Sequence, residues 1–227
     1  MNRIIRGAWM GIAPMLLISL PLVTPVRAAA PLPAVLVQAQ QAIQAAHSYK
    51  VTDTIVSIDS FGATSSSDVL TIVRQGNTLE AYVVGTDRQT DGKTTTSETV
   101  IGAKHTCTRA NGRGAWNCTL PNMGGLLNST TSFTPVASKT NHYTWSPAGT
   151  RTVHGQACAG FNETATTPTL QSHGTIWFSL AGKLPVLATE HGTHFNKAYP
   201  SYSSKDTTTM VWSNWNDPSL RIPNVGA

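Results

Sequence analysis

Short runs of β-branched and aromatic residues, separated by turn signals, fill the chain from residue 49 onward. The runs recur roughly every 8–12 residues, and Gly, Asn and Asp mark the turns, as in Gln75-Gly76-Asn77 and Asp91-Gly92. The composition agrees, because 32 of the 227 residues are Thr and only 12% of residues are charged. This pattern predicts a mostly β domain and excludes a coiled coil or a collagen.

The expected strands cover residues 49–59, 69–74, 79–85, 96–102, a hairpin around Cys107 and Cys118, 142–145, 151–161, 174–180, 185–190 and 207–215, with a turn at 62–67. Several runs are apolar on both sides, which fits either two packed sheets or one curved sheet with contacts on both faces. One helix followed by strands joined by short hairpins favours a single curved antiparallel sheet with a helix against it. The expected fold class is therefore α+β, mostly β.

Residues 1–28 have the layout of a secretory signal peptide. Arg3 and Arg6 precede an apolar stretch over residues 8–23, and small residues follow it. A membrane anchor is the competing interpretation, but a span needs about 20 apolar residues, and Pro14, Pro21 and Pro25 interrupt a segment of that length here. We expect cleavage near Ala28, no lipid anchor because no cysteine follows, and a single exported domain over 29–227.

One amphipathic helix is expected over about residues 34–46. Its apolar stripe consists of Leu36, Ala39, Ile43 and Ala46, at the spacing of a buried helical face.

Residues 121–135 break the strand pattern, because leucines there lie among glycine and asparagine. The segment is too irregular for a strand and too apolar for a plain surface loop. We expect a short helical lid over the core. An ordinary crossover that packs Leu126 and Leu127 inward is an equal alternative.

Cys107 and Cys118 flank the turn signal at residues 111–114 symmetrically. Two strands joined by this turn would place the two side chains opposite each other. In an oxidising compartment this predicts a cross-strand disulfide. Cys158 remains and is expected to be a small buried hydrophobe.

Sequence signatures of catalysis and of nucleotide binding are absent, since the chain has no G-x-S-x-G, P-loop or G-x-G-x-x-G. The eleven acidic residues are dispersed and indicate no acid–base pair. His191 and His194 are the nearest approach to a metal-ligand pair, but residues three apart on a strand point to opposite faces. We expect no enzyme activity, no cofactor, no metal and, without charge runs, no nucleic-acid partner.

Five tryptophans lie on or beside the expected strands: Trp116, Trp145, Trp177, Trp212 and Trp215. They favour core packing over an aromatic surface for sugar or lipid.

Four segments carry a family resemblance. Residues 175–186 contain Thr-Ile-Trp-Phe and Gly-Lys-Leu-Pro-Val, and residues 212–223 contain Asn-Asp-Pro. Nearer the N-terminus, residues 45–49 lead from the expected helix to a strand, and residues 102–116 lie where a hairpin is expected before the mid-chain insertion. In this order they resemble exported LolA-like and LppX/LprG-like proteins. The Thr-rich strands and the cysteine pair are not part of that pattern.

The resemblance implies a half-open β-barrel whose concave side is closed by helices and binds acyl chains. It implies a non-catalytic soluble carrier, expected to be a monomer, for lipid or lipoprotein acyl chains, with a membrane-bound donor or acceptor protein as a further partner. The residues expected to line the cavity are Leu36, Ile43, Ile55, Leu70, Ile72, Leu79, Val83, Leu126 and Leu127. The alternative is an envelope regulatory or scaffolding domain that binds another protein through the same fold.

Overall fold

The computed structural model describes residues 33–76, 78–120, 142–195 and 203–225. The expected signal segment and the expected lid, with Leu126 and Leu127, lie outside these residues.

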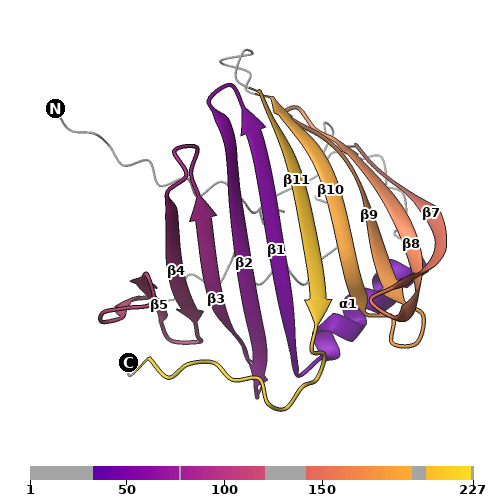
Figure 1. The fold of residues 1–227 in the computed structure, drawn as a ribbon. Helices are drawn as coiled ribbons and strands as arrows, with labels where there is room; N and C mark the ends of the chain where they lie inside the picture. The colour runs from indigo at the N-terminus through magenta and orange to yellow at the C-terminus, as the bar shows by residue number, and fades with distance from the viewer. Residues whose placement is uncertain (1–32, 77, 121–141, 196–202, 226–227) are drawn as a thin grey trace, which may run out of the picture.

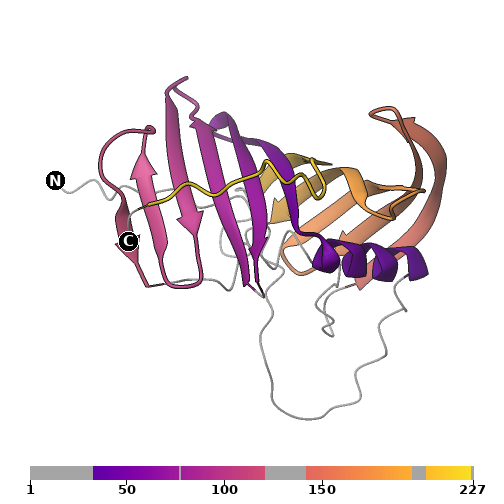
Figure 2. The same cartoon turned by 90° about the horizontal axis from the view of Figure 1, so that it is seen from below.

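The described strands form one antiparallel sheet of eleven strands, which is bent but not closed (Figures 1 and 2). Its order is β6-β5-β4-β3-β2-β1-β11-β10-β9-β8-β7, so that β6 and β7 are the two edges. The strands are β1 (Ser48–Asp59), β2 (Gly62–Gln75), β3 (Thr78–Arg88), β4 (Thr94–Ile101), β5 (Thr106–Ala110), β6 (Asn117–Thr119), β7 (His142–Val153), β8 (Gln156–Thr166), β9 (Leu170–Ser179), β10 (Pro185–Phe195) and β11 (Ser203–Ser213). The expected mostly β, single-sheet fold is confirmed.

The helix α1 (Ala34–Ala45) lies along one face of the sheet, on the side of the C-terminal strands (Figure 2). Its stripe of Leu36, Ala39, Ile43 and Ala46 is buried, as the apolar spacing predicts. Arg74 of β2 contacts the end of the helix, where its guanidinium donates to the carbonyl oxygens of residues 44 and 46. These contacts satisfy carbonyl groups that a helix C-terminus leaves without partners.

The face that packs against α1, here called the helix-side face, is defined by the strand register. Val51 pairs with Leu70 on one side and with Trp212 on the other, and these three side chains are buried against α1. Side chains of alternate residues point to the other face, here called the outer face. The core of the helix-side face consists of Leu36, Ala39, Ile43, Ala46, Tyr49, Val51, Leu70, Ile72, Ala81, Ile101, Ile176, Phe178 and Trp212.

A smaller apolar cluster lies on the outer face, formed by Val153, Cys158, Trp177 and Val186. The guanidinium of Arg151 stacks over the Trp177 ring at 4.0 Å. The sheet therefore has apolar contacts on both sides, which explains why the strand sequences are apolar on both faces.

The C-terminal segment is tied to the start of β1. The backbone N–H of Asn216 donates to the carbonyl of Ser48 at 2.7 Å, and the Asn216 side chain accepts from the N–H of His47 at 2.7 Å. The rings of Tyr49 and Trp215 stack at 4.6 Å. The segment that follows β11 is thus fixed to the junction between α1 and β1.

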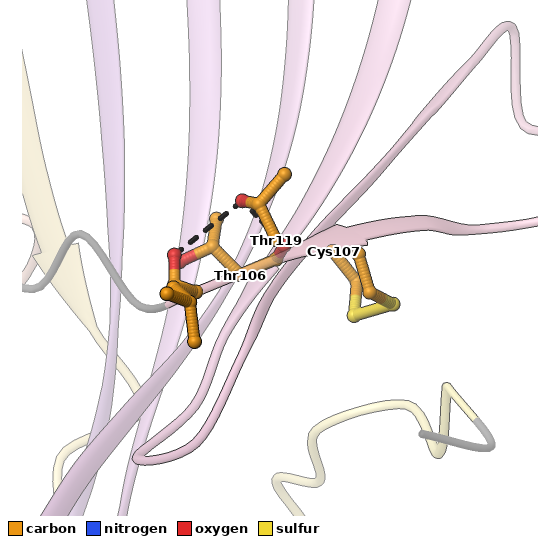
Figure 3. The surroundings of a disulfide bond; sticks show 5 residues. Thr106, Cys107 and Thr119 are labelled. Atoms are coloured by element: carbon orange, nitrogen blue, oxygen red, sulfur yellow. Dashed lines mark hydrogen bonds between the residues drawn. A yellow bond between two sulfur atoms is a disulfide. The ribbon is translucent and has the colours of Figure 1, made fainter.

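The predicted disulfide is present between Cys107 of β5 and Cys118 of β6, whose Cα atoms are 4.0 Å apart (Figure 3). The two cysteines are direct cross-strand partners. Beside them, the Thr119 hydroxyl donates to the Thr106 carbonyl at 3.4 Å. Cys158 is free and buried, as expected.

Two local expectations are wrong. The expected strand over residues 151–161 is two strands, because His154 and Gly155 form a tight turn with φ values of 47° and 77°. The expected turn at 62–67 is the beginning of β2. The actual turn precedes it, where the Asp59 carboxylate accepts the N–H groups of Phe61 and Gly62.

No helix in the described ranges has the length and apolar character needed to cross a membrane.

Replacing Ile43 tests the packing of α1 on the sheet. Ile43 is 1% exposed, so Ile43→Ala should lower the free energy of unfolding by about 3 kcal/mol through lost burial and the cavity left behind. Val37 is 41% exposed on the same helix, so Val37→Ala should change it by less than about 1 kcal/mol. Urea denaturation measures both, and equal effects would contradict the placement of the helix.

Thiol counting tests the disulfide. Unreduced protein that has been unfolded should show one reactive thiol, from Cys158, and reduction should expose the thiols of Cys107 and Cys118 as well. Three thiols before reduction would contradict the bond.

Candidate functional site

The helix-side face is layered along the strands. Nearest α1 lies the buried core, and beyond it runs a row of apolar residues across four neighbouring strands. In this row, here called the apolar row, Phe161 pairs with Ile176, Ile176 with Ala188 and Ala188 with Met210. Phe161, Ala188 and Met210 are only partly buried where they pack against the core. The row therefore offers apolar surface that α1 does not fully cover.

The seven described residues that were expected to line a cavity all lie in this region. Four of them, Leu36 and Ile43 of α1 and Leu70 and Ile72 of β2, are at most 3% exposed and are closed off by the contact between helix and sheet. Ile55, Leu79 and Val83 are partly buried on the helix-side face. The structure brings these seven residues together, and only the last three are partly exposed.

Carboxylate side chains lie beside the apolar row. Met210, which ends the row, pairs with Asp53, and Asp53 pairs directly with Asp68. One step further from α1, Glu163 pairs with Gly174, and Gly174 pairs with Glu190. We call Asp53, Asp68, Glu163 and Glu190 the acidic cluster.

Asp53 is the most enclosed member of the acidic cluster. Its side chain is 5% exposed, and its Oδ1 atom has no hydrogen-bond partner among the described residues. Burial raises the pKa of Asp53 from its ordinary 3.8 to about 7, and the carboxylates of Asp68 and Glu190 add to the rise.

Burial acts on two other members of the cluster as well. Burial raises the pKa of Glu163 to about 7, with a further contribution from Glu190. Burial, followed by the charge of Asp87, also raises the pKa of Asp68. Groups that take up and release protons near neutral pH concentrate at functional sites.

Two glycines allow close packing beside these carboxylates. A Cβ atom at Gly85 would lie 2.7 Å from Oδ1 of Asp68, so the carboxylate rests on the bare backbone of β3. Gly174 lies between Glu163 and Glu190, so no side chain separates these two across the sheet.

Aromatic side chains flank the acidic cluster at the β7 edge. Trp145 pairs with Glu163, and Tyr143 lies on the same face of the same strand. Burial raises the pKa of Tyr143, and the charges of Glu163 and Glu190 add to the rise. The indole N–H groups of Trp145 and Trp212 are buried without a hydrogen-bond partner among the described residues.

Two hollows of the described surface lie elsewhere. One, of about 580 Å³, lies at the end of β11 and is lined by Trp212, Trp215, Leu184 and Val186 among others. The other, of about 730 Å³, includes outer-face side chains of Val56, Ile58, His191 and Lys205. None of the residues expected to line a cavity borders either hollow.

His191 and His194 lie on opposite faces of β10, as strand alternation predicts. His191 contacts the Thr207 hydroxyl at 3.1 Å on the outer face, whereas His194 forms an ion pair with Asp206 at 2.9 Å on the helix-side face. Within the described ranges, no three His, Cys, Asp or Glu side chains are grouped as metal ligands.

The dispersed acidic residues of the sequence indicated no site, because the cluster forms only when six neighbouring strands, from β2 to β8 in the sheet order, pair in register. A weaker signal was present. Asp53 is two residues from Val51 and from Ile55, and Glu163 is two residues from Phe161 and from Ala165, so each carboxylate shares one face of its strand with apolar neighbours. Each therefore occupies a position where the pattern predicts an apolar residue.

Asp53→Asn tests the burial of charge in the acidic cluster. Folded Asp53 and Glu163 hold protons up to about pH 7, whereas the unfolded chain loses them near pH 4, so the stability of the folded state should fall as pH rises between these values. The amide removes the charge at similar volume. It should raise the free energy of unfolding by about 2 kcal/mol at about pH 8 and reduce the pH dependence.

Chemical denaturation between about pH 5 and pH 8 measures this effect. Glu80→Gln, on the outer face of β3, removes one charge outside the cluster and serves as the control. A variant Asp53→Asn that is no more stable than the wild type at the higher pH would contradict the assignment.

No protein-family model and no curated protein matches the sequence. Among solved structures, the chain is similar to a DUF1329 family protein from Desulfovibrio piger, with 11% identity, 83% of this chain and 94% of that chain covered, and a TM-score of 0.32. It is also similar to an outer membrane lipoprotein-sorting protein domain from Vibrio parahaemolyticus (12% identity, 82% and 92% covered, TM-score 0.31). A third is a LolA superfamily protein from Nitrosomonas europaea (10% identity, 84% and 94% covered, TM-score 0.27). Two of these three structures, the lipoprotein-sorting domain and the LolA superfamily protein, carry names that match the family that the sequence motifs resemble.

Proposed function

We propose that this chain is an exported, non-catalytic binding protein that holds the acyl chain of a lipid or lipoprotein against its helix-side face. The observation that carries the proposal is the apolar row, together with Ile55, Leu79 and Val83, which continues the buried core beyond the cover of α1. Soluble proteins rarely expose a continuous apolar surface of this kind, and where they do, a ligand or partner usually covers it.

The dimensions and energies suit an acyl chain. Strands lie about 4.8 Å apart, so the apolar surface from β3 to β8 extends over roughly 30 Å along the bent sheet. Each methylene group that leaves water contributes about 0.8 kcal/mol, so ten of them would supply roughly 8 kcal/mol before the costs of ordering the chain. No catalytic group is needed for this function.

Two features support export. Residues 1–28 have the layout of a signal peptide. The Cys107–Cys118 bond would be maintained in an oxidising compartment, where disulfides persist. A carrier in the cell envelope would exchange its cargo with a membrane-bound donor or acceptor, and we propose such a protein as its partner.

A second function, binding of another protein, is favoured by the outer face. Val56, Ile58 and Val69 are 39%, 56% and 37% exposed there, and the hollow of about 730 Å³ adjoins the first two. In that case the fold would serve as a regulatory or scaffolding domain.

Adjacent valines on β3 allow a matched test of the acyl-chain site. Val83 lies on the helix-side face and Val84 on the outer face, and both are partly buried. Val83→Asn should weaken the uptake of an uncharged fluorescent fatty alcohol about tenfold, because it places an amide on the apolar surface. Val84→Asn should leave the affinity within about twofold.

Titration of the fatty alcohol into the wild type and the two variants measures the difference. No uptake by the wild type, or equal losses in both variants, would contradict the proposed site and favour the protein-binding function.

A further inference from the structure

The acidic cluster is unusual for a surface built to hold an uncharged chain. Asp53 and Asp68 are direct cross-strand partners, an arrangement in which like charges repel. Glu163 and Glu190 follow on the same face, separated by Gly174, which has no side chain. Four carboxylates therefore face one region of the helix-side face.

We propose that the acidic cluster binds an organic ammonium group, so that the ligand of the helix-side face is a cationic amphiphile. The inference rests on the proposed function, and it adds the chemistry of the ligand's polar end. The tail would lie on the apolar row, and the ammonium group would lie between Asp53 and Glu190.

One oxygen of the buried Asp53 carboxylate has no hydrogen-bond donor among the described residues. A carboxylate that is 5% exposed normally has hydrogen-bond donors for both oxygens, yet its Oδ1 atom has none among the described residues. A buried carboxylate costs free energy unless it is protonated or meets a cation. An ammonium group carries both the charge and the N–H donors that this atom lacks.

The basic side chains of the described strands either contact other groups or lie on the outer face. On the helix-side face, Arg74 donates to the end of α1 and His194 pairs with Asp206. The other basic strand residues lie on the outer face by register: Lys50, Arg88, Arg109, Arg151 and Lys205. The cluster therefore has no protein counter-charge among the described strand residues.

Aromatic side chains beside the acidic cluster favour an organic cation over a metal ion. Trp145 is the cross-strand partner of Glu163, and Tyr143 lies next to it on the same face. Aromatic rings attract ammonium groups through their faces, and a carboxylate beside such rings is a common arrangement for binding amines. The acidic cluster also adjoins the apolar row directly, since Met210 pairs with Asp53.

The charge of the site depends on pH. The charged groups that act on Asp53 are Asp68 of β2 and Glu190 of β10, whereas β11 places Met210 and Thr208 beside it and α1 carries no ionisable side chain. Asp87 of β3 acts on Asp68, and Glu190 also acts on Glu163 of β8 and Tyr143 of β7. Asp53 and Glu163 lose their protons as pH rises through about 7, so the attraction for an ammonium group should increase in the same direction.

Three probes with the same tail separate head from tail: dodecylammonium, dodecanol and dodecanoate, titrated calorimetrically below their micelle concentrations into the full-length protein. At about pH 8, dodecylammonium should bind about tenfold more tightly than dodecanol, and dodecanoate more weakly than either. The preference for dodecylammonium over dodecanol should decrease as the pH is lowered to about 5.5.

Two variants assign the preference to the cluster. The double variant Asp53→Asn with Glu190→Gln should bind dodecylammonium and dodecanol equally. Glu80→Gln, on the outer face, should keep the wild-type preference. Retained dodecanol binding shows that a variant is folded, and the pH dependence of the wild type tests the inference without any variant.

The outcomes are distinguishable. Equal affinities of the wild type for the three probes, or tightest binding of dodecanoate, would overturn the ammonium site and leave the acyl-chain proposal intact. Binding of none of the probes would overturn both. A preference that persists unchanged in the double variant would place the cation site elsewhere and contradict the inference.

Discussion

The antiparallel pairing of β1 with β11 is the contact on which the rest of the structure depends. It runs from Lys50 opposite Ser213 to Ile58 opposite Lys205 and joins the first and last strands of the described chain into one sheet. The core against α1 draws on both halves of that sheet, with Val51 and Leu70 from one half and Phe178 and Trp212 from the other. Without this pairing, neither the core nor the acidic cluster would form.

The same pairing places apolar and acidic surface side by side. Along one register line, the apolar row ends at Met210, and the next two residues are Asp53 and Asp68. Burying like charges reduces the stability of the free protein, and such arrangements persist where they serve binding. The α1 contact supplies stability at one end of the face, and the other end is available for a ligand with a long tail and a charged head.

Local features of the fold could be predicted from the sequence, and pairings between distant strands could not. The stripe through Leu36 and Ile43 predicted the helix, and the turn centred between Cys107 and Cys118 predicted the disulfide, because each depends on residues close in the chain. The His154-Gly155 turn was missed because a histidine with positive φ gives no strong turn signal. The acidic cluster depends on the register of β8, β10, β1 and β2, which no single segment determines. What the sequence did contain was a carboxylate at an apolar strand position, which in a sheet protein indicates a buried acid.

The most direct test of the account is an experimental structure of the protein purified without detergent, with whatever it binds retained. The account predicts continuous elongated density on the helix-side face, running along the apolar row past Met210, with its polar end between Asp53 and Glu190. Side chains that fill this region completely, with any bound lipid on the outer face instead, would contradict it.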